Sequence, residues 1–506
     1  MNVVNLMNFV RQIDERKANS TENMLEFTKA ELKLVNEYGV DNTFLLQYDV
    51  LCDDDFVSLF KSEANDKTEL GLWYEIVAPL TEACGIPYKS EMGWKWDWHI
   101  IPGYSMGYSP KERELLIDET MRKFKEVFGY YPKTIGGWVI DTHTLNYLSE
   151  HYDISFAGIC RDEVNTDAYT LIGGYFNQAY YPSKNNMFTP AQTMEMQTNI
   201  PVFRLLGPCP IHNYDHVKYC SDEIKKNWTR ADTVFTLEPA SNLGKCKKAV
   251  KWIFDTYYNN ENLGFGYSQI GQENSFYFWK DELIETLRMQ LDDLLQRKDV
   301  KFMKMCDTGD TFKSLFPNLT PSTSVAALDN FDTVDVQSIY YDSRCYSANL
   351  FRFEDKIFFR SLHVFNQNVK ELYLDKICTT FDAVYENLPI IDTIGVPIEN
   401  RGECGLMIDT DGTAFKTEKL EEGVLKVSFG DGYAIFRDDR IEIKAPKLLI
   451  HSNSLKADAS LSDSNIVFEY KGEKYLLKAD GAVIVQINGN IEITAKNEVI
   501  TLFPSY

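Results

Sequence analysis

Short apolar runs alternate with longer helical patterns through the first 320 residues, and this alternation limits the fold more than any other feature. The run 109–129 begins with Ser-Pro, carries apolar residues at near-helical spacing and stops at Gly129, which predicts a helix. Strand-like runs lie at 42–50, 70–77, 131–141 and 154–163. Strands that alternate with helices form a parallel sheet. Seven or eight such units predict an α/β fold with a closed or nearly closed barrel.

An open, doubly wound sheet is the structural alternative to a barrel. It fits less well, because no glycine-rich phosphate turn follows the run at 42–50; the residues there read QYDVLCDDDF. A long polar insertion occupies residues 164–200, and loops of this length inside a compact domain usually carry function.

The pattern changes near residues 316–324, FPNLTPSTS. From there to the C-terminus, short alternating runs are separated by Asp-Gly and Asn-Gly turns at 411–412, 431–432 and 488–489. This indicates an all-β domain, most simply an antiparallel sandwich. We therefore predict a catalytic barrel over residues 1–320 and a β-sandwich domain over residues 321–506.

Charge and composition exclude several classes of protein. The net charge of −23 argues against nucleic-acid binding and disfavours strongly anionic polymers. No run approaches the roughly 18 apolar residues of a membrane span. The ten cysteines include no CxxC pair, which predicts free thiols. We expect a cytoplasmic protein unless a leader is removed, and the sequence does not predict its oligomeric state.

Carboxylates follow several of the predicted strands, where the chemistry of parallel α/β barrels takes place. They are Asp49, Asp141, Asp162, Glu163, Glu238 and Glu273. Paired carboxylates beside aromatic residues suit the cleavage of glycosidic bonds, since one must be protonated and the other ionised. We predict that Asp141 is the nucleophile and Glu273 the general acid, with Glu238 in reserve for the acid role. Each carboxylate could instead cap a helix or pair with a cation.

Aromatic and amide side chains suggest a sugar-binding rim. In the stretch GWKWDWH (93–99) three tryptophans alternate with a lysine, an aspartate and a histidine, so an extended chain places the rings on one face. The predicted substrate-binding residues are Asp49, Trp96, Asp97, His99, Trp138, Asp162, Gln269, Gln272 and Asn274. The structural alternatives are aromatic packing against the 164–200 insertion and an internal amide network.

Metal chemistry stays open as an alternative, with no metal ligand assigned. His212, Asp215 and His216 cluster in PIHNYDH, but Pro210 favours a loop over the helix that would bring the two imidazoles together. Asp49 and His99 could form a mixed site. No GxSxG or P-loop motif occurs, which disfavours serine hydrolase and nucleotide chemistry.

The succession from TFLLQYD to FKEVFGYYPKTIGGWVIDTHTLNYLSEHYDISFAGICRDE resembles the seven-stranded barrels of polysaccharide deacetylases and of family-57 and family-38 glycoside hydrolases. The resemblance covers residues 40–310 and implies a (β/α)7-type barrel. It places residues 47–49 at the first strand, where the mannosidase family has His-x-Asp metal ligands; here Gln47 replaces the histidine. It matches Asp141 to that family's fourth-strand nucleophile. The deacetylase signature is incomplete, because no Asp-Asp pair and no His-x-x-x-His occur at the expected places.

These features together predict a glycoside hydrolase that cleaves a neutral oligosaccharide or glycoside. A metal-dependent carbohydrate deacetylase is the alternative within enzymes, with a divalent metal as its cofactor. A non-catalytic carbohydrate-binding protein is the alternative outside them. The sugar, its linkage and the stereochemical course of the reaction are not predicted.

Overall fold

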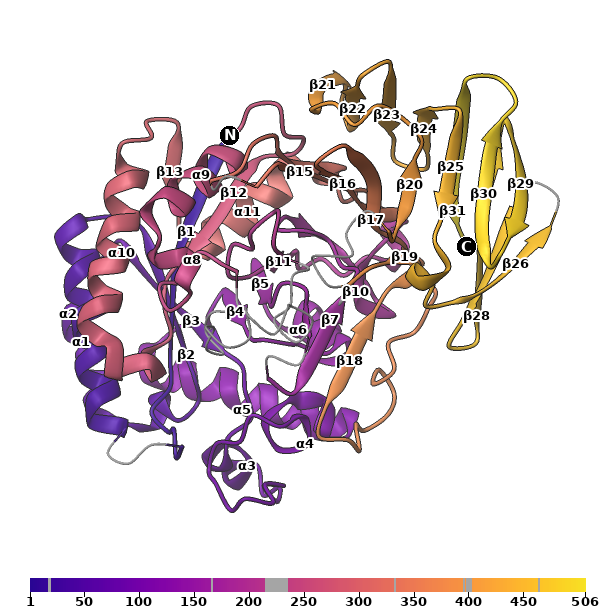
Figure 1. Cartoon of the computed structure of the whole chain (residues 1–506). Helices are drawn as coiled ribbons and strands as arrows, with labels where there is room; N and C mark the ends of the chain where they lie inside the picture. Colours follow the sequence, from indigo (N-terminus) through magenta and orange to yellow (C-terminus); the bar gives the residue numbers. More distant parts are fainter. Residues whose placement is uncertain are drawn as a thin grey trace.

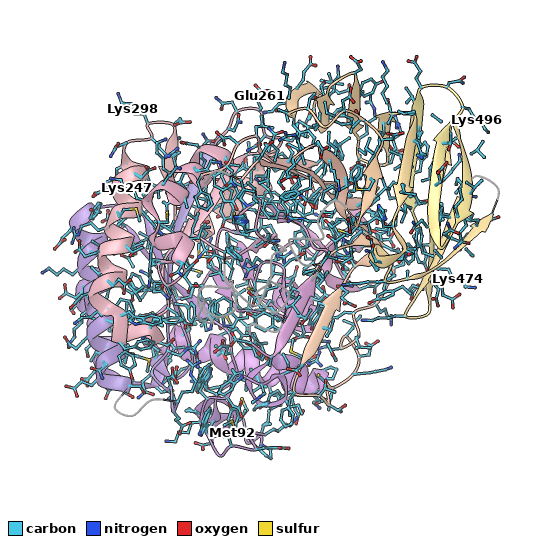
Figure 2. The ribbon with its side chains drawn as sticks, viewed as in Figure 1. Met92, Lys247, Glu261, Lys298, Lys474 and Lys496 are labelled. Atoms are coloured by element: carbon cyan, nitrogen blue, oxygen red, sulfur yellow. The ribbon has the colours of Figure 1, made fainter. Side chains whose placement is uncertain are left out.

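The computed structural model describes residues 1–16, 20–164, 167–213, 235–331, 334–394, 396, 403–462 and 465–506. The N-terminal half, here residues 1–320, is a curled parallel sheet with helices outside it, and the C-terminal half, residues 321–506, consists of β-sheets stacked at its side (Figure 1). Figure 2 shows side chains filling the space between these layers, with Met92 at the edge of the molecule.

Seven parallel strands form the curled sheet. Their order is β12 (Gly266–Ile270), β1 (Asn2–Val10), β2 (Asn42–Leu46), β3 (Thr68–Trp73), β4 (Thr134–Gly136), β5 (Phe156–Ile159) and β11 (Val202–Arg204). β8 (Ala179–Tyr180) extends the sheet antiparallel to β11, and β13 (Val300–Phe302) also pairs with β1. The predicted α/β class is therefore confirmed.

Side chains bridge the two ends of this sheet. Gln269 on β12 accepts a hydrogen bond from the Leu206 amide at 2.6 Å, and Asn177 donates to the Tyr267 carbonyl at 2.9 Å. Within the described residues, no strand ladder joins β11 to β12. The sheet is thus strongly curled, while a fully closed (β/α)7 barrel stays a prediction.

The first strand of the sheet is β1, which the sequence analysis did not identify. All nine residues of β1, NVVNLMNFV, are buried, although three of them are asparagines. The Asn5 amide is accommodated by bonds to the Met303 carbonyl (2.9 Å) and the Thr308 hydroxyl (2.7 Å). The run at 42–50 therefore supplies the second strand, and the assignment of residues 47–49 to the first-strand position is wrong.

Helices cover the outer side of the sheet (Figure 1). The longer ones are α1 (Ser20–Tyr38), α2 (Asp54–Glu63), α5 (Pro110–Phe128), α6 (Thr142–His151), α9 (Lys247–Tyr257), α10 (Lys280–Leu295) and α11 (Met305–Leu315). Short helices are α3 (Ala78–Ala83), α4 (Ile100–Gly103), α8 (Asn242–Lys245) and the 3-10 helix η6 (Asn274–Trp279). α5 begins after Ser109 and ends before Gly129, which has φ 86°, as its sequence predicted. A capping box between Ser109 and Glu112 closes its first turn.

Two antiparallel sheets make up most of the C-terminal half, which confirms its predicted all-β character. One runs in the order β14 (Thr323–Ala327), β15 (Val336–Asp342), β16 (Tyr346–Phe353), β17 (Lys356–Val364), β20 (Leu406–Ile408), β25 (Lys447–Ile450), β30 (Asn490–Ala495) and β29 (Ala482–Ile487), with β19 (Leu388–Asp392) on β17. The other runs β21 (Lys416–Glu421), β22 (Val424–Phe429), β23 (Gly432–Phe436), β24 (Ile441–Lys444), β31 (Val499–Ser505), β28 (Glu473–Asp480), β27 (Asn465–Tyr470) and β26 (Asp458–Ser462). Apolar residues of both sheets, such as Leu350 and Val427, share one core.

The two halves are closely joined. The first β-sheet also packs on the curled sheet, because Val325, Tyr340 and Phe351 belong to the core of the N-terminal half. β18 (Ala383–Glu386) pairs in parallel with β7 (Tyr169–Ile172), which also pairs with β6 (Glu163–Val164). A strand from after residue 320 thus completes a sheet in the 164–200 insertion, and a division at 320/321 stays a prediction.

The described residues of the 164–200 insertion form further short strands. The insertion contains β8, β9 (Pro182–Ser183) and β10 (Asn186–Pro190), and most of its aromatic side chains are buried. The nine cysteines in the described part of the chain are free. None of the described helices has the length and apolar character to cross a membrane.

Candidate active site

A cavity of about 310 Å³ lies at the carboxyl ends of the parallel strands. Arg11 follows β1, Glu75 follows β3, Trp138 follows β4, Glu163 begins β6 shortly after β5, and Glu273 follows β12. The other lining residues are Arg16, Trp96, Trp98, Tyr104, Asp167, Tyr169, Leu206, Glu238, Ala240, Ser241, Phe276 and Trp279. Strand ends therefore gather carboxylates around one space, as the sequence predicted for this fold.

Aromatic rings form the walls of the cavity. Trp138 packs edge-on against Phe9 and Trp73. The rings of Phe9 and Trp73 stack on each other with their centroids 3.9 Å apart. Trp96 is almost fully buried, and its indole N–H donates to Glu75 at 2.7 Å. Rigid rings beside hydrogen-bonding groups are what a sugar-binding site needs, because sugar rings have both apolar faces and hydroxyl edges.

Arg11 is the central cation of the cavity. Its Nη2 lies 3.5 Å from Glu75 and 3.4 Å from Glu273, and its guanidinium stacks over the Trp96 ring at 4.1 Å. Burial opposes the charge, but Glu75 and Glu273 outweigh it and raise the pKa of Arg11 above its ordinary value. Arg11 therefore holds two carboxylates and one indole in a fixed arrangement.

Glu238 and Glu273 have different electrostatic surroundings. Burial, together with the nearby charge of Glu273, raises the pKa of Glu238 to about 8, so Glu238 keeps its proton at neutral pH. Glu238 also accepts a hydrogen bond from Gln272 Nε2 at 3.1 Å. Burial raises the pKa of Glu273 too, but Arg11 and a hydrogen bond from Ser275 (2.5 Å) oppose this rise. Glu238 is thus protonated at neutral pH, whereas Glu273 has a cation and a hydrogen-bond donor beside it that favour its charged form.

Glu163 supplies a further carboxyl to the cavity. One of its oxygens lies 3.3 Å from Arg161, while the other, Oε1, is buried without a hydrogen-bond partner. Burial raises the pKa of Glu163 above its ordinary value. A buried polar atom without a partner is unfavourable, so Oε1 is suited to bind a donor such as a ligand hydroxyl.

Five of the residues predicted from the sequence line the cavity: Glu163, Glu238, Glu273, Trp96 and Trp138. Asp141 does not. The structure corrects its position, because the strand ends at Gly136 and Asp141 lies five residues later as the N-cap of α6. Trp138, not Asp141, occupies the strand end that borders the cavity.

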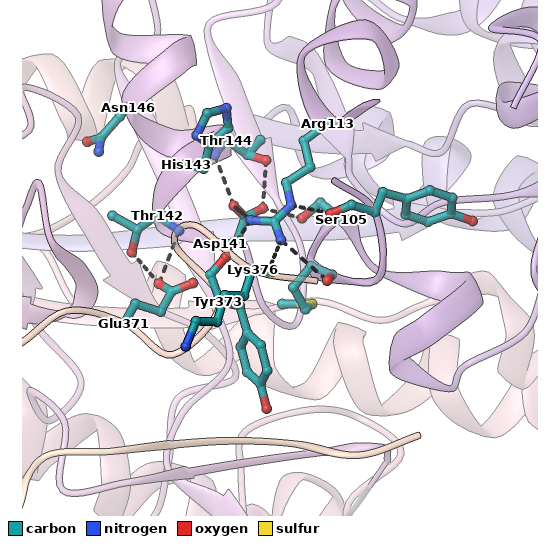
Figure 3. A network of polar contacts seen from close by, with 12 residues as sticks. Ser105, Arg113, Asp141, Thr142, His143, Thr144, Asn146, Glu371, Tyr373 and Lys376 are labelled. Carbon is teal, nitrogen blue, oxygen red and sulfur yellow. Dashed lines mark hydrogen bonds and ion pairs between the residues drawn. The ribbon is translucent and has the colours of Figure 1, made fainter. Parts of the chain in front are cut away.

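Asp141 belongs to a buried network at the N-terminus of α6 (Figure 3). It pairs with Arg113 of α5 at 2.8 Å, and both side chains are fully buried. It also accepts hydrogen bonds from Ser105 and from the Thr144 hydroxyl (2.6 Å) and amide (3.1 Å). Burial disfavours its charge, yet Arg113 and these donors hold the pKa of Asp141 below its ordinary value. This arrangement argues against a nucleophilic role, because the carboxylate is surrounded by donors of the protein itself.

Two other predicted carboxylates also bind backbone amides instead of facing the cavity. Asp49 accepts from the amides of Gln12 (2.9 Å), Ile13 (2.7 Å) and Val50 (2.9 Å), and burial raises its pKa to about 6. Asp162 accepts from the Gly173 amide (2.8 Å) and pairs with Arg204 (2.6 Å). Asp49 fixes the loop that carries Arg11, and Asp162 fixes the turn after β7.

The predicted amides are used within the protein as well. Gln269 bridges β12 to Leu206, and Asn274 clamps the backbone of Arg11 through bonds of 3.1 and 2.9 Å. Gln272 accepts from the Ala240 amide and donates to Glu238. The structural alternative of an amide network therefore describes these residues, and Gln272 positions a carboxyl of the cavity.

Asp97 and His99 lie beside the cavity and do not line it. Asp97 is buried and accepts from Ser90 (2.7 Å), while its other oxygen lies 2.7 Å from His99 Nδ1. Trp98, between them in the chain, lines the cavity although the sequence analysis did not select it. The predicted single aromatic face is thus divided between Trp96 inside the cavity and partly exposed Trp94.

Arg11 and Glu75 are the main residues that the sequence analysis missed. Arg11 directly follows β1, so identification of NVVNLMNFV as a strand would have indicated it. Glu75 lies within the run 70–77 that was predicted as strand, but β3 ends at Trp73, which places Glu75 just beyond the strand end. Trp279 had no such signal, since it lies at the end of η6.

The described residues do not fit the metal site that the resemblance would imply. Asp49 lies on the second strand with its oxygens bound to backbone amides, and His99 Nδ1 contacts Asp97. Within the described ranges, no group of three or more His, Cys, Asp or Glu side chains has an arrangement that could hold a metal ion. His212 is described and packs against Phe235, whereas Asp215 and His216 lie outside the described residues.

Comparisons with known proteins identify the fold. No protein-family model and no curated protein sequence matches the chain. A solved structure from Parabacteroides distasonis, described as a putative glycoside hydrolase/deacetylase, is similar with a TM-score of 0.54 and 14% identity. The match covers 79% of this chain and 93% of that one. The resemblance predicted from the sequence is confirmed for the fold.

Two more distant structures are similar as well. One is a probable polysaccharide deacetylase from Pseudomonas aeruginosa, with 12% identity over 62% of this chain and 92% of that one and a TM-score of 0.37. The other is a 4-alpha-glucanotransferase from Thermococcus litoralis, with 9% identity over 100% and 98% of the two chains and a TM-score of 0.33. At these TM-scores neither bears on the function of this chain.

Proposed function

We propose that this protein is a glycoside hydrolase in which Glu238 is the general acid and Glu273 is the ionised catalytic carboxylate. The observation that carries the proposal is the unequal pair in one aromatic cavity: the pKa of Glu238 is raised to about 8, while Arg11 lies 3.4 Å from Glu273. Glycosidic bond cleavage requires one protonated and one ionised carboxyl. The sequence predicted Glu273 as the general acid and Asp141 as the nucleophile. In this proposal Glu238 is the general acid, and Glu273 takes the role predicted for Asp141.

In the proposed reaction, the proton of Glu238 moves to the glycosidic oxygen as the bond to the anomeric carbon breaks. In one course Glu273 attacks that carbon, and water then releases the sugar from Glu273 while ionised Glu238 takes up a proton of that water. In the other course Glu273 removes a proton from a water molecule that attacks the carbon directly. Gln272 orients Glu238, and Arg11 favours the charged form of Glu273 while stacking on Trp96. Glu75 supports this arrangement, since it binds both Arg11 and the Trp96 indole.

The cavity favours neutral or cationic sugars over acidic ones. Glu75, Glu163, Asp167, Glu238 and Glu273 line it, whereas Arg11 and Arg16 are its lining cations and each pairs with a carboxylate. A uronic acid would bring a further negative charge to this group. The chain's net charge of −23 acts in the same direction at longer range.

The direct test is a screen against aryl glycosides and neutral oligosaccharides, followed by substitution of the two carboxylates. We expect Glu238→Gln and Glu273→Gln each to lower kcat by at least about 10³-fold with little loss of stability, since each removes an interaction of the transition state. Asp342→Asn is the matched control: burial raises the pKa of Asp342 to about 8 as well, but Asp342 does not line the cavity.

Three outcomes would contradict the proposal. The first is an absence of turnover on every glycoside, and the second is near-normal turnover in either Gln variant. The third is an equal loss of kcat in Asp342→Asn, which would mean that these substitutions lower activity only by destabilising the fold. Sugar binding without turnover by the wild-type protein would favour the non-catalytic alternative.

Carbohydrate deacetylation is the second candidate, favoured by the fold shared with the Parabacteroides distasonis structure. It would require a bound metal ion, and the described residues contain no group of three or more His, Cys, Asp or Glu side chains that could hold one. Incubation with a chelator separates the two: glycosidase activity should be unchanged, whereas acetate release that is lost and then restored by a divalent ion would establish the deacetylase.

A further inference from the structure

A row of aromatic rings leads from the cavity to the protein surface. Trp98 lines the cavity, and its ring centroid lies 6.4 Å from that of Trp96, 5.4 Å from that of Trp94 and 4.9 Å from that of His99. The next ring is Phe381, 5.1 Å from His99 and 40% exposed. The rings are therefore continuous from the inside of the cavity to solvent.

Phe381 comes from a distant part of the chain and is held in place by several backbone bonds. It lies on segment 366–382, which connects β17 to β18, and its carbonyl accepts from the Ile100 amide at 2.9 Å. The Cys378 amide donates to the Met106 carbonyl at 2.7 Å. The backbone that carries the ring is thus held beside His99 before any ligand arrives, which lowers the entropic cost of binding.

The buried network of Asp141 anchors the same segment (Figure 3). Arg113 donates to the carbonyls of Tyr373 and Lys376, each at 2.8 Å, while Glu371 accepts from Thr142. Asp141 holds Arg113 in the position from which it makes these bonds. The network therefore holds residues 371–376 of this segment against α5 and the start of α6.

Polar groups lie within the row, which suits sugars better than a purely apolar partner. Asp97 contacts His99 Nδ1 at 2.7 Å, so Nε2 lies on the side of the imidazole away from Asp97. Lys95 is exposed between Trp94 and Trp96. At about 310 Å³ the cavity is at the small end of ligand sites, so most of a longer glycan must lie outside it.

We propose that Trp94, Trp98, His99 and Phe381 form an additional carbohydrate-binding surface that holds the units of an oligosaccharide beyond those inside the cavity. The inference rests on the proposed function for its ligand class, but it concerns binding and not turnover. It implies that the natural substrate is an oligosaccharide or polymer rather than a small glycoside.

The test measures affinity against chain length in the full-length Glu238→Gln protein, which separates binding from cleavage. Cello-, malto- and chito-oligosaccharides of two to six units are titrated by calorimetry. We expect affinity to rise with length in at least one series. Phe381→Ala should weaken binding of the six-unit ligand about 3- to 10-fold, and that of the two-unit ligand less than 2-fold, since one stacking ring is lost.

Leu372→Ala is the matched control, because Leu372 lies on the same segment with 64% of its surface exposed and should not affect either ligand. Phe278→Ala tests the other exposed aromatic group beside the cavity, next to Trp279. The proposal would be overturned if Phe278→Ala, but not Phe381→Ala, lost affinity in a way that depends on ligand length. It would also be overturned if Phe381→Ala lost equal affinity for short and long ligands, or if no ligand series bound. Tight binding with an inactive wild-type protein would refute the hydrolase and leave this surface intact.

Discussion

Replacement of Asp141 by alanine distinguishes a structural carboxylate from a catalytic one. Asp141 and Arg113 are both fully buried at 2.8 Å, so the substitution leaves Arg113 without its counter-ion. Breaking a buried ion pair by removal of one partner costs about 3–5 kcal/mol. Because the network joins α5, α6 and segment 366–382, we expect this loss to appear as local opening of those elements.

Hydrogen exchange followed by mass spectrometry measures such opening directly. A loss of about 3–5 kcal/mol corresponds to a fall in protection of about 10²- to 10⁴-fold. It should affect peptides from residues 100–116, 141–151 and 371–382, while peptides from the outer sheet around β26–β28 keep their protection. Turnover of a short substrate per folded molecule should change less than about 3-fold, because Asp141 does not line the cavity.

Asp53→Ala supplies the control for helix capping alone. Asp53 caps α2 through the amides of Asp55 and Phe56, and the loss of such a cap costs only about 1 kcal/mol. The reasoning fails if Asp141→Ala loses no more protection than Asp53→Ala while its turnover falls by orders of magnitude. Asp141 would then be the nucleophile that the sequence predicted.

Three other predictions concern the titration of buried groups. As pH rises through about 8, kcat of the wild-type enzyme should fall, because Glu238 then loses the proton that it must donate; a pH–rate profile without this limb would contradict the acid role. Arg11→Met should lower kcat and move the acid limb of the same profile to higher pH, since Arg11 opposes the rise in the pKa of Glu273; an unmoved limb would separate Arg11 from that carboxylate. Burial and the charge of Asp141 raise the pKa of Glu371 to about 8, so the folded state binds its proton more tightly than the unfolded chain and stability falls between about pH 4.5 and 8. Glu371→Gln should therefore lose less thermal stability than the wild-type protein between pH 6 and 9, and equal losses would refute this cause.

Local patterns in the sequence were sufficient for much of the fold. The limits of α5 follow from Ser109, Glu112 and Gly129, which act within one or two turns of the helix. β1 was missed because its asparagines interrupt the apolar pattern, and their partners, such as Met303 and Thr308, lie about 300 residues away. A strand whose polar residues are satisfied by distant groups has no local signature.

The candidate site could be predicted only in part for the same reason. Asp141 precedes Thr-His-Thr, and this local sequence fits both a carboxylate at a strand end and a helix cap. The contacts that decide between the two are made by Arg113 and segment 366–382, which are distant in the sequence. Glu238 and Glu273 were identified because each follows an apolar run. The raised pKa of Glu238 and the pairing of Glu273 with Arg11 could not be predicted, since these surroundings arise only in the folded chain.

The pairing of β18 with β7 has a consequence for synthesis of the chain. About 210 residues separate Ile172 from Ala383, and at 5–20 residues per second a ribosome needs about 10–40 s to make them. During that time β7 has an unpaired edge, and Trp98 and His99 have no Phe381 beside them. An unpaired strand edge can associate with other chains. The nascent polypeptide therefore passes through an interval in which its future cavity mouth is open to misassembly, and slower translation would lengthen that interval.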